Sequence, residues 1–185
     1  MINAADQVGR LISVKPSPRQ LAWQKLEFYA FIHYGMNQFT DREWGTGEED
    51  PKIFNPLNLD TDQWCACIAK AGMRAVILTA KHHDGFCLWN TKHTTHSVMY
   101  SPCGEDIVAR LARSCRAFDL KLGIYLSPWD RHDPRYGQGK AYDEFFCGQL
   151  TELLSGYGDI FCIWLDGALG EGPNGHEQRY DWDRY

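Results

Sequence analysis

Three apolar segments of this chain each end in a polar cluster. One runs into Asp166 through Ile163-Trp164-Leu165, another leads into the pair His82-His83, and a third ends at His33. In a parallel barrel every strand delivers its C-terminal residues to the same face, and catalysis takes place at that face. The pattern therefore predicts strands whose ends converge on one site.

Apolar runs with the character of buried strands alternate with helical patterns along the chain. The predicted strands, each short and nearly continuously apolar, are Phe28 to His33, Arg74 to Thr79, Lys121 to Ser127 and Asp159 to Leu165. Three helical stripes lie between them: Trp64, Cys67, Ile68 and Ala71; Ile107, Val108, Leu111 and Cys115; and Tyr142, Phe145, Phe146, Leu150, Leu153 and Leu154. Asp60 and Gln63 resemble a capping box at the first helix. This order predicts right-handed crossovers and a parallel sheet.

The loop after the first strand distinguishes between two possible folds, a barrel and an open sheet. A Rossmann domain would place a Gly-rich phosphate turn there, but residues 36–58 contain no such pattern. A complete (β/α)8 barrel takes about 250 residues, whereas this chain has 185. We therefore expect one α/β domain over residues 1–185, with TIM-barrel-like topology and only the first half of the barrel: about four parallel strands with three crossover helices.

Composition excludes several classes of protein. The net charge of -5 gives no basic patch for nucleic acid. Residues 1–20 contain no apolar signal region, and no segment is long and apolar enough to span a bilayer, so neither secretion nor a membrane partner is expected. Seven scattered cysteines, four of them in apolar runs (Cys65, Cys67, Cys115, Cys162), are typical of reduced core thiols in a cytoplasmic protein.

Four motifs in order carry a family resemblance. They are FIHYGMNQFTDREWG, TAKHHDGFCLWNTKHT, LGIYLSPWDRHD and IWLDGALGEGPNG. Together they resemble the N-terminal half of the catalytic barrel of alpha-L-fucosidases, glycoside hydrolase family twenty-nine, over roughly residues 23–185. Residues 170–182 resemble the branch that removes alpha-1,3/1,4-linked fucose from branched Lewis-type glycans. The resemblance implies a fucosylated glycan or L-fucose as the ligand, without a cofactor or a metal ion.

The resemblance also implies retaining, two-step hydrolysis with Asp166 as the nucleophile. A carboxylate at the mouth of a barrel can attack an anomeric carbon as oxocarbenium character develops. Taken alone, Asp166-Gly167 would be read as a turn after the strand. Its position within the four motifs favours the nucleophile.

The remaining site residues are implied as a sugar-binding shell. His33, His82 and His83 match the histidines that line the fucose pocket, and a neutral imidazole can both donate to and accept from a hydroxyl. Adjacent His82 and His83 can both reach the pocket only if the chain turns there, as Asp84-Gly85 allows. The other members are Glu43 and Trp44 after the first strand, and Tyr125 and Trp129 at the third, where this chain has Leu126 in place of a second tyrosine found in many relatives.

The family's general acid/base is a glutamate downstream of the nucleophile. Glu171 and Glu177 lie in that direction but do not match its motif. A retaining pair needs its carboxyl groups about 5 to 5.5 Å apart.

Three functional hypotheses remain open from the sequence. The first is a fucosidase domain that uses Asp166. The second is a non-catalytic half-barrel that associates with itself, because unpaired strands at both edges of a half-barrel drive association and predict a homo-oligomer, most simply a dimer. The third is a metal-dependent hydrolase that uses His33, His82, His83 and Asp166 as ligands, which the absence of an HxH pair on the first strand disfavours.

Overall fold

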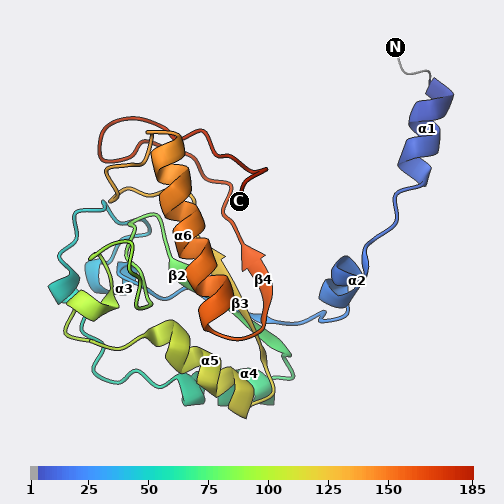
Figure 1. Ribbon diagram of the computed structural model, residues 1–185. Helices are drawn as coiled ribbons and strands as arrows, with labels where there is room; N and C mark the ends of the chain where they lie inside the picture. Colours follow the sequence, from blue (N-terminus) through green and yellow to red (C-terminus); the bar gives the residue numbers. More distant parts are fainter. Residues whose placement is uncertain (1–3) are drawn as a thin grey trace.

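The computed structural model describes residues 4–185. Its α-helices are α1 (Ala4–Ile12), α2 (Pro18–Gln24), α3 (Asn37–Thr40), α4 (Thr61–Lys70), α5 (Ile107–Ala117) and α6 (Lys140–Gly156), and its 3-10 helices are η1 (Pro51–Ile53) and η2 (Val98–Tyr100). The strands are β1 (Ala30–Ile32), β2 (Ala75–Lys81), β3 (Lys121–Leu126) and β4 (Ile160–Trp164). Figure 1 shows α6 lying along the sheet, while α1 and α2 extend away from the main body.

The four strands form one parallel sheet in the order β1-β2-β3-β4. A crossover helix connects each pair: α4 follows β1, α5 follows β2 and α6 follows β3. This confirms the predicted α/β fold with four parallel strands and three crossover helices. The strand from Phe28 to His33 is shorter than predicted, since only Ala30–Ile32 is paired as a strand.

The sheet is curled as in a barrel. Phe31 on β1 and Trp164 on β4 lie at opposite edges, and three strand spacings of about 4.8 Å would separate them by about 14 Å in a flat sheet. Their ring centroids are instead 5.6 Å apart. Phe31 also meets Tyr125 of β3 edge to face, at 6.0 Å. The concave face is therefore aromatic near the C-terminal ends of its strands.

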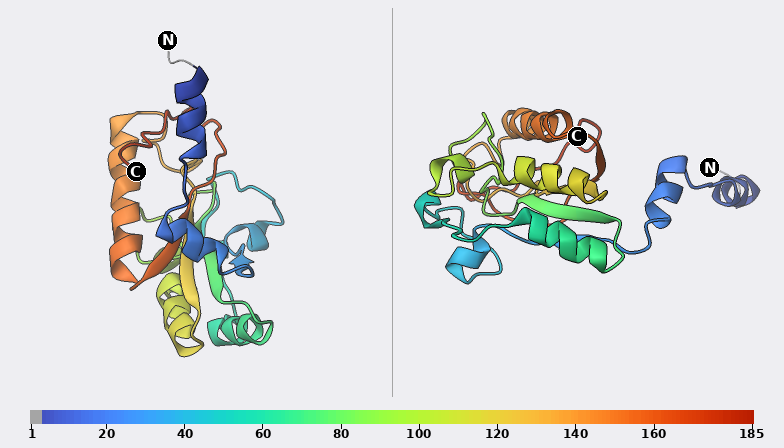
Figure 2. Two further views of the ribbon diagram at one scale, coloured as in Figure 1. Left: turned by 90° about the vertical axis from the view of Figure 1, so that its right-hand side faces the viewer. Right: turned by 90° about the horizontal axis from the view of Figure 1, so that it is seen from below.

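The main core lies between the convex face of the sheet and the crossover helices (Figure 2). Alternate residues of the central strands enter it: Val76, Leu78 and Ala80 from β2, and Leu122, Ile124 and Leu126 from β3. All four residues of the predicted stripe on α5 are buried. The predicted stripe on α4 is wrong at Cys67 and Ala71, and the stripe on α6 is wrong at Leu154, because these three residues are exposed. Cys65 occupies the buried position on α4, so Cys67 is not a core thiol, and Cys162 is only half-buried.

The cap of α4 is half of the predicted capping box. Oδ1 of Asp60 accepts a hydrogen bond from the backbone N–H of Gln63 at 3.0 Å. The Gln63 amide does not return to Asp60; it lies 3.3 Å from Sγ of Cys67 instead. One carboxylate is enough to satisfy an exposed donor in the first turn.

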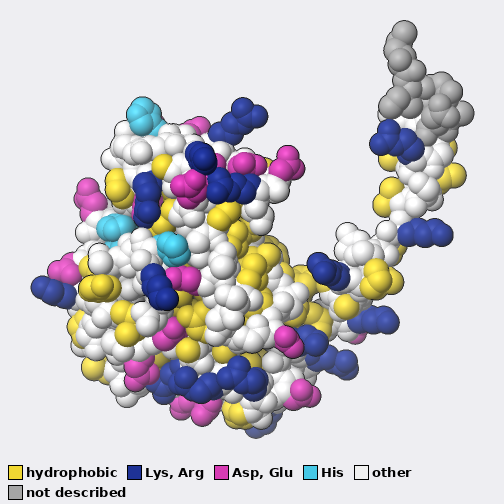
Figure 3. Space-filling view, in the orientation of Figure 1, with side chains coloured by type: hydrophobic (Ala, Val, Ile, Leu, Met, Phe, Trp, Pro, Cys, Tyr) yellow, Lys and Arg dark blue, Asp and Glu magenta, His cyan; other side chains and the backbone are white. Residues whose placement is uncertain are grey.

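No helix in residues 4–185 meets the length and hydropathy needed to cross a bilayer. Helix α1, which the sequence analysis did not predict, carries exposed apolar residues at Val8, Leu11 and Ile12. Figure 3 shows hydrophobic side chains gathered on the side of the main body from which α1 and α2 extend. Trp23 of α2 reaches back to the sheet, stacking on Phe161 of β4 with 5.7 Å between ring centroids.

Candidate functional site

The ends of all four strands meet in a cluster of rings around one carboxylate. His33, one residue after β1, lies against His82 with ring centroids 4.6 Å apart. His82 stacks on Tyr125 of β3 at 5.8 Å. The Tyr125 hydroxyl donates a hydrogen bond of 2.8 Å to Oδ2 of Asp166, two residues after β4. The structure thus places these four predicted residues in direct succession across the sheet.

The other predicted residues extend this cluster toward the loop after β1. His83 packs on Trp129 at 4.7 Å between centroids, and Trp44 meets both rings, at 6.0 Å from His83 and 5.5 Å from Trp129. Glu43, which is exposed, lines a cavity of about 370 Å³ together with His33, Trp44 and His82. All eight predicted side chains therefore lie in one continuous region.

A turn directly after β2 brings both adjacent histidines into this region. The strand ends at Lys81, and the N–H of Gly85 donates to the carbonyl of His82 at 3.0 Å. Gly85 has φ +76°, a conformation that glycine adopts without steric cost. The side chain of Asp84 accepts from the N–H of Phe86 at 2.7 Å and closes the turn. The predicted requirement for a turn at Asp84-Gly85 is confirmed.

The side chain of Asp166 is an ionised carboxylate at neutral pH. Burial acts to raise its pKa, but hydrogen bonds from the N–H of Ala168 (2.8 Å, to Oδ1) and from Tyr125 outweigh burial, and the pKa lies below the usual value. The Tyr125 hydroxyl keeps its proton, because burial and the bond to Asp166 raise its pKa. An ionised carboxylate with one oxygen held by a side-chain donor has the properties that a nucleophile requires.

The two central histidines are neutral at pH 7. Burial lowers the pKa of His82 to about 3, helped by the proximity of His83 and His33. Burial also lowers the pKa of His83 to about 4, even though the charge of Asp166 opposes the shift. Neutral imidazoles each offer one donor and one acceptor, which matches the bonding capacity of a hydroxyl.

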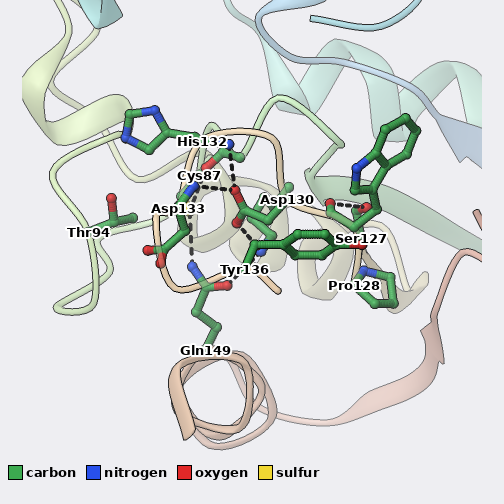
Figure 4. A network of polar contacts seen from close by, with 12 residues as sticks. Cys87, Thr94, Ser127, Pro128, Asp130, His132, Asp133, Tyr136 and Gln149 are labelled. Atoms are coloured by element: carbon green, nitrogen blue, oxygen red, sulfur yellow. Dashed lines mark hydrogen bonds and ion pairs between the residues drawn. The ribbon is translucent and has the colours of Figure 1, made fainter. Parts of the chain in front are cut away.

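A buried polar network beneath the cluster was not predicted. Nζ of Lys81 lies 2.9 Å from both Oδ2 of Asp130 and Oε1 of Gln149, the latter on α6. The other oxygen of Asp130 accepts from the N–H groups of His132 and Asp133, as seen in Figure 4. A lysine inside an apolar strand was the available sequence signal, because a buried charge requires a partner.

The segment that follows Asp166 folds over Trp129. Nε1 of Trp129 donates to the carbonyl of Glu171 at 3.0 Å, and a Cβ at Gly170 would come within 2.4 Å of the indole, so that position has no room for a side chain. Glu171 and Glu177 are both exposed and pair with each other in an isolated antiparallel bridge. Their backbones thus form a hairpin-like closure beside the site.

The third hypothesis, a metal centre, finds no support in the geometry. In residues 4–185 no group of three or more His, Cys, Asp and Glu side chains is arranged to hold a metal ion.

Comparison with known proteins identifies the family. The model of the alpha-L-fucosidase family matches residues 15–184. The chain belongs to the alpha-L-fucosidase family. It is 48% identical to alpha-L-fucosidase 1 of Arabidopsis thaliana over 169 residues, which cover 90% of this chain and 33% of the plant protein. The chain thus spans about a third of the length of the curated relatives it matches.

Solved structures of the same family share this architecture. A glycoside hydrolase family twenty-nine member from a rumen bacterium matches with a TM-score of 0.84 and 50% identity, over 90% of this chain and 31% of the other. A family twenty-nine fucosidase of Ruminococcus gnavus, solved in complex with fucose, matches with a TM-score of 0.81 and 35% identity, over 92% of this chain and 39% of the other. The sheet of four strands is therefore the N-terminal part of a fucosidase TIM barrel.

Proposed function

We propose that this chain supplies the nucleophile and part of the sugar-binding shell of a retaining alpha-L-fucosidase site. The observation that carries the proposal is the Tyr125–Asp166 hydrogen bond at the strand ends, which holds an ionised carboxylate beside two neutral histidines. In the first step Asp166 attacks the anomeric carbon, the glycosidic oxygen leaves, and a covalent glycosyl ester forms. In the second step a water molecule attacks the same carbon and breaks the ester bond, its proton passes to the acid/base group that acted in the first step, and fucose and the free carboxylate are released.

The shell residues have distinct roles in this proposal. His33, His82 and His83 each form a hydrogen bond with a sugar hydroxyl, and Glu43 accepts from one at the rim of the cavity. Trp44, half-exposed beside Trp129, offers an apolar face to the methyl group and the C–H surface of fucose. The fucose in the related R. gnavus structure supports this ligand class.

The proton donor of the first step is assigned to no residue of this chain. Glu171 and Glu177 are bridged to each other through their backbones and are exposed, and neither contacts Asp166 by hydrogen bonding. A good leaving group needs little acid assistance, whereas a sugar leaving group needs a proton. We therefore expect activated fucosides to react with Asp166 and natural linkages to be cleaved very slowly by the 185-residue chain.

The test is covalent trapping. After incubation with 2-fluoro-fucosyl fluoride, mass spectrometry is expected to find one adduct, on the peptide that contains Asp166. Asp166→Asn is expected to abolish it, and the matched variant Asp159→Asn, which alters an exposed carboxylate next to the opposite end of β4, is expected to retain it. No adduct, or an adduct that survives in Asp166→Asn, would rule out Asp166 as a working nucleophile.

The finer substrate assignment is the alpha-1,3/1,4-linked fucose of branched glycans. It is supported by the segment 170–178, which packs next to the site: Nε1 of Trp129 donates to the carbonyl of Glu171, and Asn174 donates to the carbonyl of Tyr136. The rest of a branched glycan, extending out of the fucose pocket, would contact this surface. An alpha-1,3-fucosylated trisaccharide should therefore bind more tightly than an alpha-1,2-fucosylated one, and equal affinities would contradict the assignment.

Free sugar provides an independent test of the pocket. We expect L-fucose to bind in the millimolar range, as an order of magnitude, because an open site encloses little of the ligand. D-Galactose should bind more weakly, as measured by the change in intrinsic Trp fluorescence, to which the Trp44–Trp129 pair contributes. Indistinguishable responses to the two sugars would favour a structural role alone.

A second candidate function, a self-associating half-barrel, is favoured by the exposed edges of the sheet. Phe31 and Trp164 sit on the two edge strands and remain 41% and 40% exposed. We propose that β4 of one chain pairs with β1 of a second chain at two equivalent seams, which gives eight strands and no free edge. Light scattering of the 185-residue chain is expected to show a dimer.

Variants in the edge strand separate this seam from other contacts. Trp164→Glu places a charge on the concave face and is expected to shift the dimer toward monomer. Trp182→Glu alters an equally large exposed indole away from the sheet and is expected to leave the dimer intact. A monodisperse wild-type monomer at micromolar concentration would contradict the association.

A further inference from the structure

Ser127 connects His83 to the backbone behind it through two short hydrogen bonds. Nδ1 of His83 lies 2.7 Å from the Ser127 hydroxyl. That hydroxyl donates to the carbonyl oxygen of Trp129, also at 2.7 Å, which is the dashed line at Ser127 in Figure 4. A carbonyl can only accept, and a serine hydroxyl has a single proton to give. The proton of Ser127 is therefore committed to Trp129, and the contact with His83 requires a proton on Nδ1.

The opposite nitrogen of His83 is the one left for a ligand. Nε2 makes no hydrogen bond to any residue between 4 and 185, and it is not sealed from solvent, in contrast to Nδ1 of His82. In a neutral imidazole with a proton on Nδ1, Nε2 carries a lone pair. We propose that Ser127 is a positioning residue that fixes the Nδ1–H tautomer of His83, so that the pocket presents an acceptor at Nε2.

The chain of hydrogen bonds from His83 through Ser127 to Trp129, called the relay below, is flanked by backbone hydrogen bonds at both ends. The N–H of Ser127 donates to the carbonyl of Lys81 at 3.0 Å, and the N–H of Arg131 donates to the carbonyl of His83 at 2.8 Å. Ser127 is completely buried, so water does not compete for its hydroxyl. The relay is therefore built into the junction between the ends of β2 and β3 and does not depend on a ligand.

A fixed acceptor gives the site a chemical preference. This step rests on the proposed function: the sugar group that meets Nε2 must be a donor, which a hydroxyl is and a methoxy group or a fluorine is not. A site built to accept from a hydroxyl disfavours an analogue that lacks the donor, because its own polar atom is then unpaired.

The tautomer can be measured directly by ¹⁵N NMR of the histidine rings at pH 7. The His83 signals are assigned by their loss in His83→Gln. We expect Nδ1 to be protonated and Nε2 to be unprotonated in the wild-type chain without sugar. An Nε2–H tautomer in the wild type would overturn the proposal, whether or not any variant folds.

The variant Ser127→Ala tests whether the serine sets this state. We expect His83 to lose its preference for Nδ1–H and L-fucose to bind about fivefold more weakly, the effect of one neutral hydrogen bond. Ser97→Ala is the matched control, since it removes a buried serine hydroxyl that has no partner in the described structure. An unchanged His83 tautomer in folded Ser127→Ala would also overturn the proposal.

Titration with L-fucose separates the relay from the proposed function. A shift of the Nε2 resonance with Nδ1–H retained supports both. An Nδ1–H tautomer that depends on Ser127, together with no response of any site resonance to L-fucose, leaves the relay intact and contradicts the fucose site.

Discussion

Nζ of Lys81 lies 2.9 Å from Oδ2 of Asp130, and the two side chains are 0% and 1% exposed. The rings of Tyr142, Phe145 and Phe146 on α6 surround the ammonium at 5.3 to 5.9 Å. The ion pair ties the end of β2 to the loop after β3, immediately before the histidines of the candidate site. Its loss should therefore affect both the stability of the fold and the geometry of the site.

The first prediction is that Lys81→Met lowers the free energy of unfolding by about 3 to 5 kcal/mol, because it leaves the Asp130 carboxylate buried without its partner. Urea denaturation at pH 7 measures the change. The double variant Lys81→Met/Asp130→Asn should be more stable than Lys81→Met, since the unpaired charge is gone. Lys140→Met, which removes an exposed partner of Glu144, is the control and should change stability by about 0.5 kcal/mol or less. A similar loss in both lysine variants would argue against the buried pair.

The second prediction concerns His96, which is buried against His132 with ring centroids 3.8 Å apart. Burial and the neighbouring His132 lower the pKa of His96 to about 4, while Asp130, Glu49 and the carbonyl of Asp84 act to raise it. His96 takes up a proton near pH 6.5 in the unfolded chain but only near pH 4 in the folded chain. The free energy of unfolding therefore decreases as pH falls from about 6.5 toward 4.

His96→Gln should flatten that loss by up to about 1.4 kcal/mol per pH unit between pH 6 and 5, the effect of one proton. Urea denaturation at several pH values gives the slope, and the measurement at pH 7.5 isolates the packing change. An identical slope in wild type and variant would show that His96 is protonated equally in both states.

The third prediction has the opposite sign. Burial raises the pKa of Asp84 to about 7, and its Oδ2 has no hydrogen-bond partner in the described structure. The folded chain keeps the proton on Asp84, while the unfolded chain releases it near pH 4. Asp84 therefore lowers the free energy of unfolding progressively as pH rises from about 4 to 7. Asp84→Asn removes this loss of stability, because asparagine does not titrate. Stability of the variant should consequently rise more steeply than that of the wild type between pH 5 and 6, whereas a shallower rise would mean that Asp84 is ionised in the fold.

Strand order and the location of the site followed from the sequence for a simple reason. Each buried strand ends where its apolar run gives way to a polar residue, as at His33, His82 and Asp166, and parallel topology brings those ends together. The aromatic partners Trp44 and Trp129 came from motif resemblance, since no local periodicity marks a loop residue.

The buried polar residues behind the site were not predicted, because each acts through a partner that is distant in the sequence. Lys81 and Asp130 are 49 positions apart, and Ser127 and His83 are 44 apart. Nothing in a single sequence states which buried polar group faces which. Cys67 was assigned to the wrong face of α4 because Cys65 and Cys67 both suit an apolar stripe, and only packing against α5 distinguishes them: Sγ of Cys65 lies 4.0 Å from Sγ of Cys115.

The last prediction uses two glycines of helix α6. A Cβ at Gly148 would lie 2.3 Å from Cε1 of His93, whereas a Cβ at Gly156 would have no neighbour within 4 Å. Alanine is favoured over glycine in helices by up to about 1 kcal/mol, so Gly156→Ala should be neutral or stabilising. Gly148→Ala should be destabilising, because it displaces the His93 ring from Phe145 and Glu152. In a His93→Ala background the same substitution should become stabilising, and additive effects in this double-mutant cycle, measured by urea denaturation, would show that the ring does not contact Gly148.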